Sequence, residues 1–337
     1  MFRPILPIAL AAVFSFLTAT AFSQPAAEEA PALDSQERLA AIYAGSVPKN
    51  IDDLLAMEKQ QRELAKKLIA CTVGVRVGNA QGSGVVISRD GYVLTAAHVI
   101  GKPNKNAFIT FPDGKTVRAK TMGLNRTVDG GLLKISEEGD WAFTEMGSSD
   151  DLLAGQWVFV TGHPGGYLSD RKPVVRLGRV LTSANEAIIT DCPLVGGDSG
   201  GPLFDADGKV IGINSRIGVA LTQNIHVPID TYRNTWDRLT RGEAWGYLPG
   251  HRPMIGVQGQ QDADDARISK VFENSPAEKA GIEVGDTIIE FGGKRITDFG
   301  SLSKLVKEYM PGDRVDLKVR RGDQELKLRI TIGRQQK

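Results

Sequence analysis

Cysteine is scarce in this sequence. Cys71 and Cys192 are the two cysteines among 337 residues. Two isolated cysteines are too few for a thiolate zinc site, and they imply no disulfide framework. We therefore expect neither a metal site nor a cofactor. One bridge between the two cysteines and two buried free thiols both fit the sequence.

An excess of charge of one sign is also lacking. The chain has 41 basic and 40 acidic residues, and its net charge is +1. Proteins that bind nucleic acid usually carry a basic patch or run, and this sequence has no long basic run. We therefore predict no nucleic-acid partner. With 24% charged and 41% hydrophobic residues, the composition is that of a globular protein with room for two domains.

Long hydrophobic runs are missing except at the N-terminus. Arg3 precedes an uncharged stretch that ends at Phe22, and Ala21 and Ser23 are the small residues that a signal peptidase recognises. We expect residues 1–23 to be a secretory signal and the protein to be exported, periplasmic or secreted. The stretch is at the lower edge of the length that spans a bilayer, so an uncleaved membrane anchor is the alternative.

Residues 24–69 are expected to form a flexible and then helical leader. The first part is rich in alanine, proline and acidic residues, which favours a flexible segment. Residues 51–70 place apolar side chains among charges at helical spacing, with acidic residues early and lysines late. This pattern predicts an amphipathic helix that packs on the following domain or on a neighbouring subunit.

From residue 70 the sequence consists of short β-rich runs. Turn formers such as Asp-Gly separate them, which predicts an antiparallel barrel or sandwich over residues 70–245. Residues 231–245 are predicted to be a closing helix. The segment GYLPGHRP, residues 246–253, is expected to be a linker because it contains glycine and proline.

A second, smaller domain of α+β type is predicted over residues 254–335. Its helix signals are complete: Ser275 is a candidate N-cap, Pro276 stands at the first helical position, Glu278 completes a capping box and Gly281 ends the helix. Two alternating apolar runs near the end of the domain predict a two-stranded ribbon.

Ser199 lies in the glycine-rich run GGDSGGPLF, residues 196–204. Glycine costs backbone entropy when it is fixed, so four glycines around one hydroxyl suggest that the backbone of this turn has a function. A nucleophilic serine needs backbone N–H groups to bind the oxyanion that forms when it attacks a carbonyl. Gly197 and Ser199 could supply two such donors. A glycine-rich surface turn is the alternative.

Local context does not single out a general base or an acid. His98 ends an apolar run, His163 lies in a loop, and His226 alternates into a strand. Asp129 precedes the apolar run LLKI, which places a carboxylate at the start of a strand beside two glycines. A simple Asp-Gly turn explains Asp129 equally well.

The order of the motifs resembles the trypsin-like serine proteases. TAAH comes first, then an aspartate before LLKI, and then GDSGGPL. With the PDZ-like segment from MIGV onward, the chain is similar to the HtrA/Deg family. The resemblance implies two six-stranded β-barrels followed by a small α+β PDZ domain. It also implies that His98 is the general base, Asp129 orients it, Ser199 is the nucleophile, and the Gly197 and Ser199 amides form the oxyanion hole.

The resemblance implies an exported serine endopeptidase that cleaves unfolded or damaged proteins, guided or regulated by its PDZ domain. It further implies a homo-oligomer, a trimer or a multiple of trimers. A non-hydrolytic peptide-binding or chaperone scaffold that keeps the protease fold is the alternative. An activatable digestive-type protease is disfavoured, because no cleavage-dependent Ile-Val or Val-Val terminus precedes the barrel.

Binding positions also follow from the resemblance. Pro193 is expected at the base of the primary specificity pocket, with His226 nearby. Because an unpaired buried cation is costly, this pocket should accept small or medium apolar side chains rather than Arg or Lys. In the PDZ domain, Ile255, Gly256 and Val257 are expected to hold the terminal carboxylate of C-terminal peptides.

The sequence departs from the family pattern in two places. Asp198 stands where the family usually has Asn, and two glycines follow Asp129 where a larger apolar residue and an alanine are usual. A buried carboxylate without a partner is expensive. We therefore expect Asp198 either to face solvent or to pair with a cation such as Arg216.

Overall fold

The computed structural model describes residues 34–184, 186–218, 220, 222–248, 250–260 and 263–335. The expected signal, residues 1–23, lies outside the described residues. Helix α1 (Ser35–Tyr43), which the sequence did not reveal, comes first and is N-capped by Asp34. Helix α2 (Ile51–Cys71) follows and confirms the helix predicted over residues 51–70. None of the described helices is long and apolar enough to cross a membrane.

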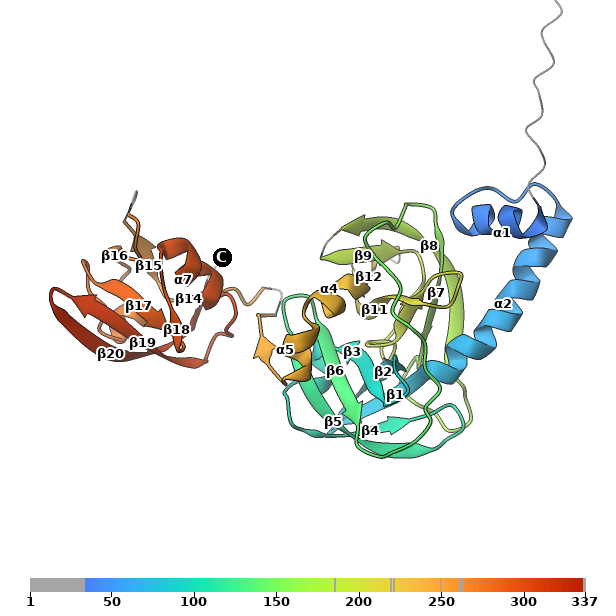
Figure 1. Ribbon diagram of the computed structural model, residues 1–337, viewed down its shortest axis with the longest axis horizontal. Helices are drawn as coiled ribbons and strands as arrows, with labels where there is room; N and C mark the ends of the chain where they lie inside the picture. Colours follow the sequence, from blue (N-terminus) through green and yellow to red (C-terminus); the bar gives the residue numbers. More distant parts are fainter. Residues whose placement is uncertain are drawn as a thin grey trace, which may run out of the picture.

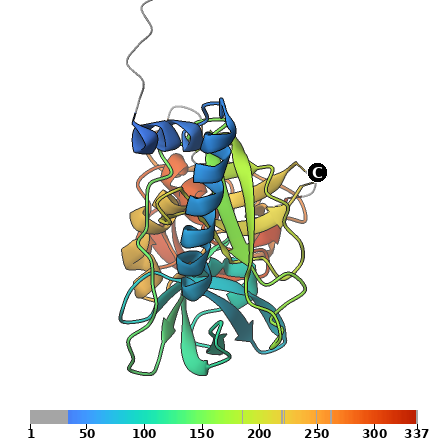
Figure 2. The ribbon, with the colours of Figure 1, turned by 90° about the vertical axis from the view of Figure 1, so that its right-hand side faces the viewer.

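Helix α2 runs along the outside of the barrels (Figures 1 and 2). Its last turns are buried: Leu68 and Cys71 join a core cluster with Phe159 and Phe204. Its N-terminal half leaves Leu54 and other apolar side chains exposed. The amphipathic pattern therefore anchors the C-terminal half of the helix on the domain that follows.

The first barrel contains six antiparallel strands. Their order is β5-β4-β1-β2-β3-β6, and pairing of β6 with β5 closes the barrel. The short helix α3 (Ala97–Ile100) follows β3 directly. The strands are β1 (Thr72–Val77), β2 (Ala80–Val86), β3 (Tyr92–Ala96), β4 (Asn106–Thr110), β5 (Thr116–Asn125) and β6 (Gly130–Ile135).

The second barrel is also antiparallel and closed, in the order β10-β11-β12-β9-β8-β7. Side chains alternate between interior and surface along such strands, so each barrel fills its own interior. One large cluster, with Phe159 and Leu132 among its members, contains residues of both barrels. The strands are β7 (Trp157–Gly162), β8 (Val174–Ala184), β9 (Ala187–Thr190), β10 (Pro202–Phe204), β11 (Val210–Ile217) and β12 (Asn224–Pro228).

The two cysteines are buried free thiols. Cys71 belongs to the cluster shared by the barrels, and Cys192 lies in a separate cluster inside the second barrel. Burial raises the pKa of each thiol to about 12. Of the two alternatives for the cysteines, the structure therefore supports the free thiols.

The prediction of one closing helix over residues 231–245 is wrong. The segment forms α4 (Ile229–Asn234), α5 (Trp236–Thr240) and then strand β13 (Ala244–Trp245). Thr235 between the helices has φ −117° and ψ 14°, which breaks the helical backbone. The last residues instead pair with β5 in parallel, because the buried Trp245 packs there against the first barrel.

The C-terminal domain has its own apolar core, which includes Phe291, Leu302 and Val319. A four-stranded sheet of order β18-β17-β19-β20 contains the predicted ribbon as β19 and β20. Two smaller sheets pair β14 with β21 and β15 with β16. The elements are β14 (Pro253–Met254), β15 (Val257–Gly259), β16 (Ile268–Val271), α6 (Pro276–Lys279), β17 (Thr287–Phe291), β18 (Lys294–Arg295), α7 (Phe299–Val306), β19 (Arg314–Arg321), β20 (Gln324–Thr331) and β21 (Gly333–Arg334).

Helix α6 begins and ends as predicted, but its capping box is incomplete. The Ser275 hydroxyl accepts a hydrogen bond from the Glu278 amide, as an N-cap should. The Glu278 carboxylate accepts from the Asn274 amide at 2.6 Å instead of from Ser275. Gly281, at φ +81°, follows the helix end.

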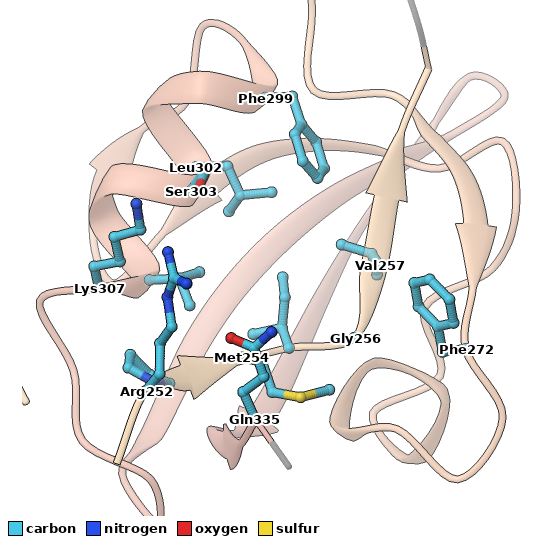
Figure 3. A pocket seen from close by; sticks show the side chains of 13 residues that line it. Arg252, Met254, Gly256, Val257, Phe272, Phe299, Leu302, Ser303, Lys307 and Gln335 are labelled. Atoms are coloured by element: carbon cyan, nitrogen blue, oxygen red, sulfur yellow. The ribbon is translucent and has the colours of Figure 1, made fainter. Parts of the chain in front are cut away.

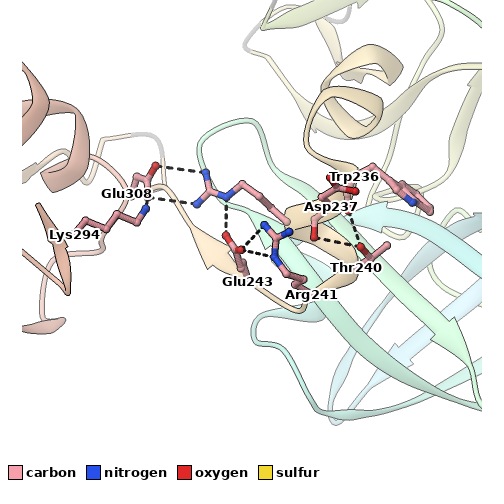
Figure 4. A network of polar contacts seen from close by, with 8 residues as sticks. Trp236, Asp237, Thr240, Arg241, Glu243, Lys294 and Glu308 are labelled. Carbon is pink, nitrogen blue, oxygen red and sulfur yellow. Dashed lines mark hydrogen bonds and ion pairs between the residues drawn. The ribbon is translucent and has the colours of Figure 1, made fainter.

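Ion pairs connect the C-terminal domain to the second of the two closing helices. Arg238 on α5 bonds Glu243 and reaches Glu308, which follows α7 (Figure 4). Lys294 lies 3.1 Å from the same Glu308 carboxylate. The Glu308 carbonyl also accepts a hydrogen bond from the Gly246 amide at 2.8 Å. A backbone hydrogen bond thus fixes the start of the linker to Glu308, just after α7, and side-chain contacts join α5 to the same residue.

Candidate active site

His98 and Asp129 form a direct pair at the edge of the first barrel. His98 lies in α3, just after β3, and Asp129 immediately precedes β6. Asp129 Oδ2 lies 2.8 Å from His98 Nδ1, and its Oδ1 accepts from the His98 backbone amide at 2.9 Å. The two bonds hold both the imidazole ring and the backbone that carries it.

The two glycines that follow Asp129 make room for the side chains of Tyr232 and Ile100. A Cβ at Gly130 would lie 3.2 Å from the ring of Tyr232, and one at Gly131 would lie 2.9 Å from Ile100. Tyr232 donates its hydroxyl to the Thr95 carbonyl at 2.7 Å. The departure from the family pattern after Asp129 thus coincides with a large aromatic ring packed against the strand.

Ser215 links the carboxylate of this pair to Ser199. The Ser215 hydroxyl donates to Asp129 Oδ2 at 2.6 Å, and the Ser215 carbonyl accepts from Ser199 Oγ at 3.4 Å. No hydrogen bond joins Ser199 to His98 within the residues that the structure describes. Sequence reasoning did not assign a role to Ser215, although it ends the VIGINS motif.

Asp129 determines the electrostatics of the imidazole. The His98 side chain is 44% exposed, whereas the Asp129 side chain is 9% exposed. The hydrogen bond to Asp129 raises the pKa of His98, although partial burial opposes the shift. With Nδ1 directed at the carboxylate, Nε2 of a neutral ring is the nitrogen that can accept a proton.

The Gly197 amide shares a peptide plane with the Gly196 carbonyl, and the Ser199 amide shares one with the Asp198 carbonyl. Hydrogen bonds to these two carbonyls therefore orient both amides. The Gly196 carbonyl accepts from the Gly165 amide at 2.6 Å, and the Asp198 carbonyl accepts from the Gly201 amide at 2.9 Å. In a planar trans peptide the N–H points opposite to the C=O. Among the described residues neither amide, at 197 or at 199, donates to a protein acceptor, so both are available as donors.

Only glycine fits at position 197 without moving the backbone. Its φ is +95°, and a Cβ there would lie 2.3 Å from the His163 carbonyl oxygen. From the first barrel, Ser83 Oγ donates to the Gly197 carbonyl at 2.8 Å and accepts from the His163 amide at 2.9 Å. Sequence reasoning missed Ser83, although it belongs to the GSGVVIS motif that carried the resemblance.

Of the two alternatives for Asp198, pairing with a cation is confirmed, but the cation is not Arg216. Asp198 is fully buried and pairs with Arg176 of β8, whose Nη1 lies 3.0 Å from Oδ2. Arg216 is exposed on β11. Burial raises the pKa of Asp198, while the Val195 amide and Arg176 act in the opposite direction. The register of the barrel strands, which sequence alone does not reveal, brings Arg176 to this carboxylate.

The two residues expected in the specificity pocket lie in different surroundings. Pro193 is exposed, whereas His226 is fully buried. The His226 ring has both nitrogens in hydrogen-bond contact, with Thr190 Oγ1 at 2.8 Å and Asn214 Oδ1 at 2.9 Å. Burial lowers the pKa of His226 to about 3, so the ring is neutral.

His163, which was also a candidate base, is not part of the His98–Asp129 pair. It is fully buried at the start of the turn behind Gly197, and burial lowers its pKa to about 4. Among the described residues, no group of His, Cys, Asp and Glu could hold a metal ion.

Two family comparisons match separate parts of the chain. Residues 82–213 match the trypsin-like peptidase domain, and residues 253–332 match the PDZ domain. The chain is 37% identical over 266 residues to a periplasmic serine endoprotease from Marinomonas sp. described as DegP-like. That alignment covers 74% of this chain and 56% of the relative. The chain belongs to the HtrA/Deg family.

Other relatives agree with this assignment. DegP-like periplasmic serine endoproteases from Hahella chejuensis and Rickettsia prowazekii are each 33% identical, over 77% and 74% of this chain. The alignments cover 58% and 52% of those proteins, so this HtrA/Deg chain spans about half the length of the curated relatives it matches.

Solved structures support the fold of the HtrA/Deg chain. The serine endoprotease from Yersinia pestis superimposes with a TM-score of 0.53 at 23% identity, over 86% of this chain and 100% of that one. The HtrA-type protease AlgW, solved with a tripeptide, gives a TM-score of 0.50 at 21% identity, over 82% and 97% of the two chains.

The PDZ domain of this HtrA/Deg chain has a pocket of about 500 Å³ between α7 and the segment before β15. Apolar side chains form most of its wall, and Phe299 and Leu302 face it from α7 (Figure 3). Arg252 and Lys307 lie on the same side of the pocket in this view. The pocket thus combines an apolar wall with two cations.

Ile255, Gly256 and Val257, the residues expected to bind a carboxylate, all line this pocket. The Ile255 carbonyl accepts from the Ala277 amide at 2.8 Å, and the Gly256 carbonyl accepts from the Phe272 amide at 3.1 Å. Both carbonyls therefore point toward α6 and the end of β16, where these hydrogen bonds hold them. The amides of Gly256 and Val257, on the opposite side of those peptide planes, point away from α6 and β16.

Proposed function

We propose that this chain is an exported serine endopeptidase that hydrolyses peptide bonds of unfolded or damaged proteins. The observation that carries the proposal is the pairing of His98 with Asp129 close to Ser199. The turn that holds Ser199 has two backbone amides whose hydrogens are not used in a hydrogen bond within the described residues. Together these are the parts that acyl transfer needs: a base with a fixed tautomer, a nucleophile and an oxyanion hole. The names of the curated relatives also support the proposal.

Each side chain has one task in the proposed reaction. Ser199 Oγ turns from the Ser215 carbonyl toward the substrate and passes its proton to His98 Nε2 as it attacks the carbonyl carbon. Asp129 keeps the proton on Nδ1 and stabilises the imidazolium that forms. The amides of Gly197 and Ser199 bind the oxyanion. His98 then returns the proton to the leaving amine, and water hydrolyses the acyl-enzyme by the same route.

The specificity pocket beside Ser199 is proposed to take small or medium apolar side chains. Pro193 carries no charge, and the buried His226 is neutral and already hydrogen-bonded. Neither Pro193 nor His226 carries a negative charge that could balance the cation of an Arg or Lys side chain. Sequencing the products of casein cleavage tests this point, and cuts mainly after Arg or Lys contradict it.

The PDZ domain is proposed to capture peptides by an apolar C-terminus. The amides at 256 and 257 would bind the terminal carboxylate, with Arg252 and Lys307 adding positive charge. Extended peptides that add to a sheet edge in this way bring substrates to the protease or regulate it. Assembly as a trimer or a multiple of trimers is also proposed, and analytical ultracentrifugation of the full chain tests it.

Labelling with a serine-directed phosphonate separates the protease from a non-hydrolytic scaffold. The protease should react stoichiometrically at Ser199 and hydrolyse casein. Ser199→Ala and His98→Ala should both abolish hydrolysis while leaving the thermal unfolding transition in place. His251→Ala, in the linker, is the matched control for the histidine change. No labelling and no hydrolysis by the wild type would favour the scaffold.

A further inference from the structure

Asp198 lies in the middle of the turn that carries the two amides. Its Oδ2 accepts from the Val195 amide at 2.9 Å and from Arg176 Nη1 at 3.0 Å. Its Oδ1 is buried and has no hydrogen-bond partner among the described residues. A buried carboxylate destabilises a protein unless an opposite charge and hydrogen bonds compensate for the lost water. Arg176 provides that charge.

Arg176 reaches the turn from a rigid element. It lies in β8, directly opposite Val160 of β7, inside the closed second barrel. Its side chain is 18% exposed, against 1% for that of Asp198, so water screens the pair little. Because a guanidinium stays protonated at all physiological pH values, the positive charge is always present.

We propose that Arg176 is a positioning residue for the oxyanion hole, which it holds in shape through Asp198. The proposal rests on the proposed peptidase function, because it assigns Arg176 a task in the same site. Within the described residues Arg176 makes no hydrogen bond or ion pair with Ser199 or His98. Its effect is therefore exerted on the backbone of the turn.

The backbone of Asp198 shows how this effect is transmitted. The Asp198 amide donates to the Val195 carbonyl at 3.1 Å, while its side chain accepts from the Val195 amide. Its carbonyl accepts from the Gly201 amide and from Asn214 Nδ2. Without Arg176, the carboxylate would lower its energy by rotating toward water. That rotation would turn the peptide planes on both sides of Asp198. The plane after Asp198 carries the Ser199 amide, and the plane before it carries the Gly197 carbonyl, so Gly197 and its own amide would move with it.

Arg171 is the other cation close to Asp198, and it is already engaged. It contributes to the electrostatics of the carboxylate at a distance, but its guanidinium donates to the carbonyls of Pro164 and Gly166. His163, in the same turn, is neutral because burial lowers its pKa. Arg171 cannot turn its Nη2 toward Asp198 without giving up the carbonyls of Pro164 and Gly166.

Steady-state hydrolysis of a peptide substrate by full-length variants tests the proposal. Arg176→Gln should lower kcat by about 10²-fold, on the scale of losing one oxyanion donor. KM should stay within about threefold of the wild-type value, since substrate contacts are unchanged. Arg176→Lys should retain an intermediate kcat. Arg179→Gln is the matched control, because Arg179 lies on the same strand and stacks on Trp157 instead.

The double variant Arg176→Gln/Asp198→Asn separates positioning from general loss of structure. Removing both charges leaves no buried ion, so kcat should rise above that of Arg176→Gln. Hydrogen exchange of the amides in residues 194–203 provides a readout that needs no activity. Exchange should increase in Arg176→Gln and return toward the wild-type rate in the double variant.

Two results would overturn the inference. One is a wild-type kcat with wild-type amide exchange in Arg176→Gln, and the other is a double variant no better than the single one in both readouts. If Arg176→Gln does not fold, recovery of folding, exchange and kcat in the double variant supports the pair, and no recovery rejects it. An inactive wild type would refute the peptidase function. The hydrogen-exchange data would still show whether the Arg176–Asp198 pair holds the turn in shape.

Discussion

Ser83 donates its hydroxyl hydrogen to the carbonyl oxygen of Gly197 across the junction of the two barrels, at 2.8 Å. The same hydroxyl accepts from the His163 amide, and the Ser83 amide donates to the Ser199 carbonyl at 2.8 Å. One residue of β2 thereby makes three hydrogen bonds to the turns that shape the proposed oxyanion hole. The first barrel thus supplies not only the His98 imidazole but also support for the turn that carries Ser199, the proposed nucleophile.

Ser83→Ala should lower both kcat and stability. Ser83 is fully buried, so the change leaves the Gly197 carbonyl and the His163 amide without a partner. Each unsatisfied buried group costs about 1–3 kcal/mol in the free energy of unfolding. Urea unfolding and steady-state kinetics measure the two effects. Ser136→Ala, an exposed serine, is the control, and equal behaviour of the two variants would contradict the role of Ser83.

Gly197→Ala should reduce hydrolysis by at least about 10²-fold, because the amide at this position, which we propose binds the oxyanion, must move. The added methyl group would lie 2.3 Å from the His163 carbonyl oxygen, and φ +95° is strained for alanine. Gly196→Ala is the matched control for folding, since its Cβ would meet open space. Thermal unfolding and phosphonate labelling of both variants check the prediction. Rapid labelling of Gly197→Ala would refute it.

The acidic limb of the pH–rate profile should report His98. The base must be neutral, and Asp129 raises the pKa of His98 above its ordinary value of about 6.5. Activity should therefore fall as the pH drops through that raised pKa. Asp129→Asn removes the cause of the shift, so the limb should move to lower pH and kcat should fall by on the order of 10⁴-fold.

Measurement of kcat/KM between about pH 5 and 9 tests this prediction in the free enzyme. Asp140→Asn is the matched control, because Asp140 is an exposed carboxylate that pairs with Arg89. An acidic limb at or below the ordinary histidine value, or one that Asp129→Asn leaves in place, would be inconsistent with the His98–Asp129 pair as the source.

The PDZ pocket should distinguish a free carboxylate from an amide. Calorimetry with the full-length Ser199→Ala variant avoids hydrolysis of the peptide. A peptide with an apolar C-terminus should bind more tightly than its amidated form. Lys307→Gln should weaken binding of the acid by about tenfold, the loss of one charge-assisted contact. Lys304→Gln is the control, because Lys304 lies in α7, one turn before Lys307, and does not line the pocket. Equal affinities for acid and amide would indicate a domain that only regulates the protease.

The sequence alone was enough to predict the two kinds of domain. Alternating apolar runs separated by Asp-Gly turns indicate antiparallel strands, and the cap residues Ser275 and Pro276 locate a helix start. Such signals are local, because they depend on residues within a few positions of each other. The prediction of one closing helix over residues 231–245 was wrong because it, too, rested on local signals alone. The helical pattern is local, but the backbone leaves the helical region at Thr235, and the last residues pair with the distant strand β5.

The residues proposed for catalysis were also found by sequence, because their motifs occur in a fixed order. Those motifs name His98, Asp129 and Ser199, but they do not tell what holds them in place. Ser215, Ser83 and Arg176 carry little local signal, since each acts by contacting a segment far away in the chain.

The sequence by itself therefore predicted the domain types from local patterns, and the order of its motifs, through the resemblance to a family, pointed to the candidate reactive residues. The tertiary structure decided that Arg176, and not Arg216, compensates Asp198. Partner choice for a buried charge depends on which strand of a closed barrel lies beneath it. That depends on strand register, which is set by the packing of the whole barrel.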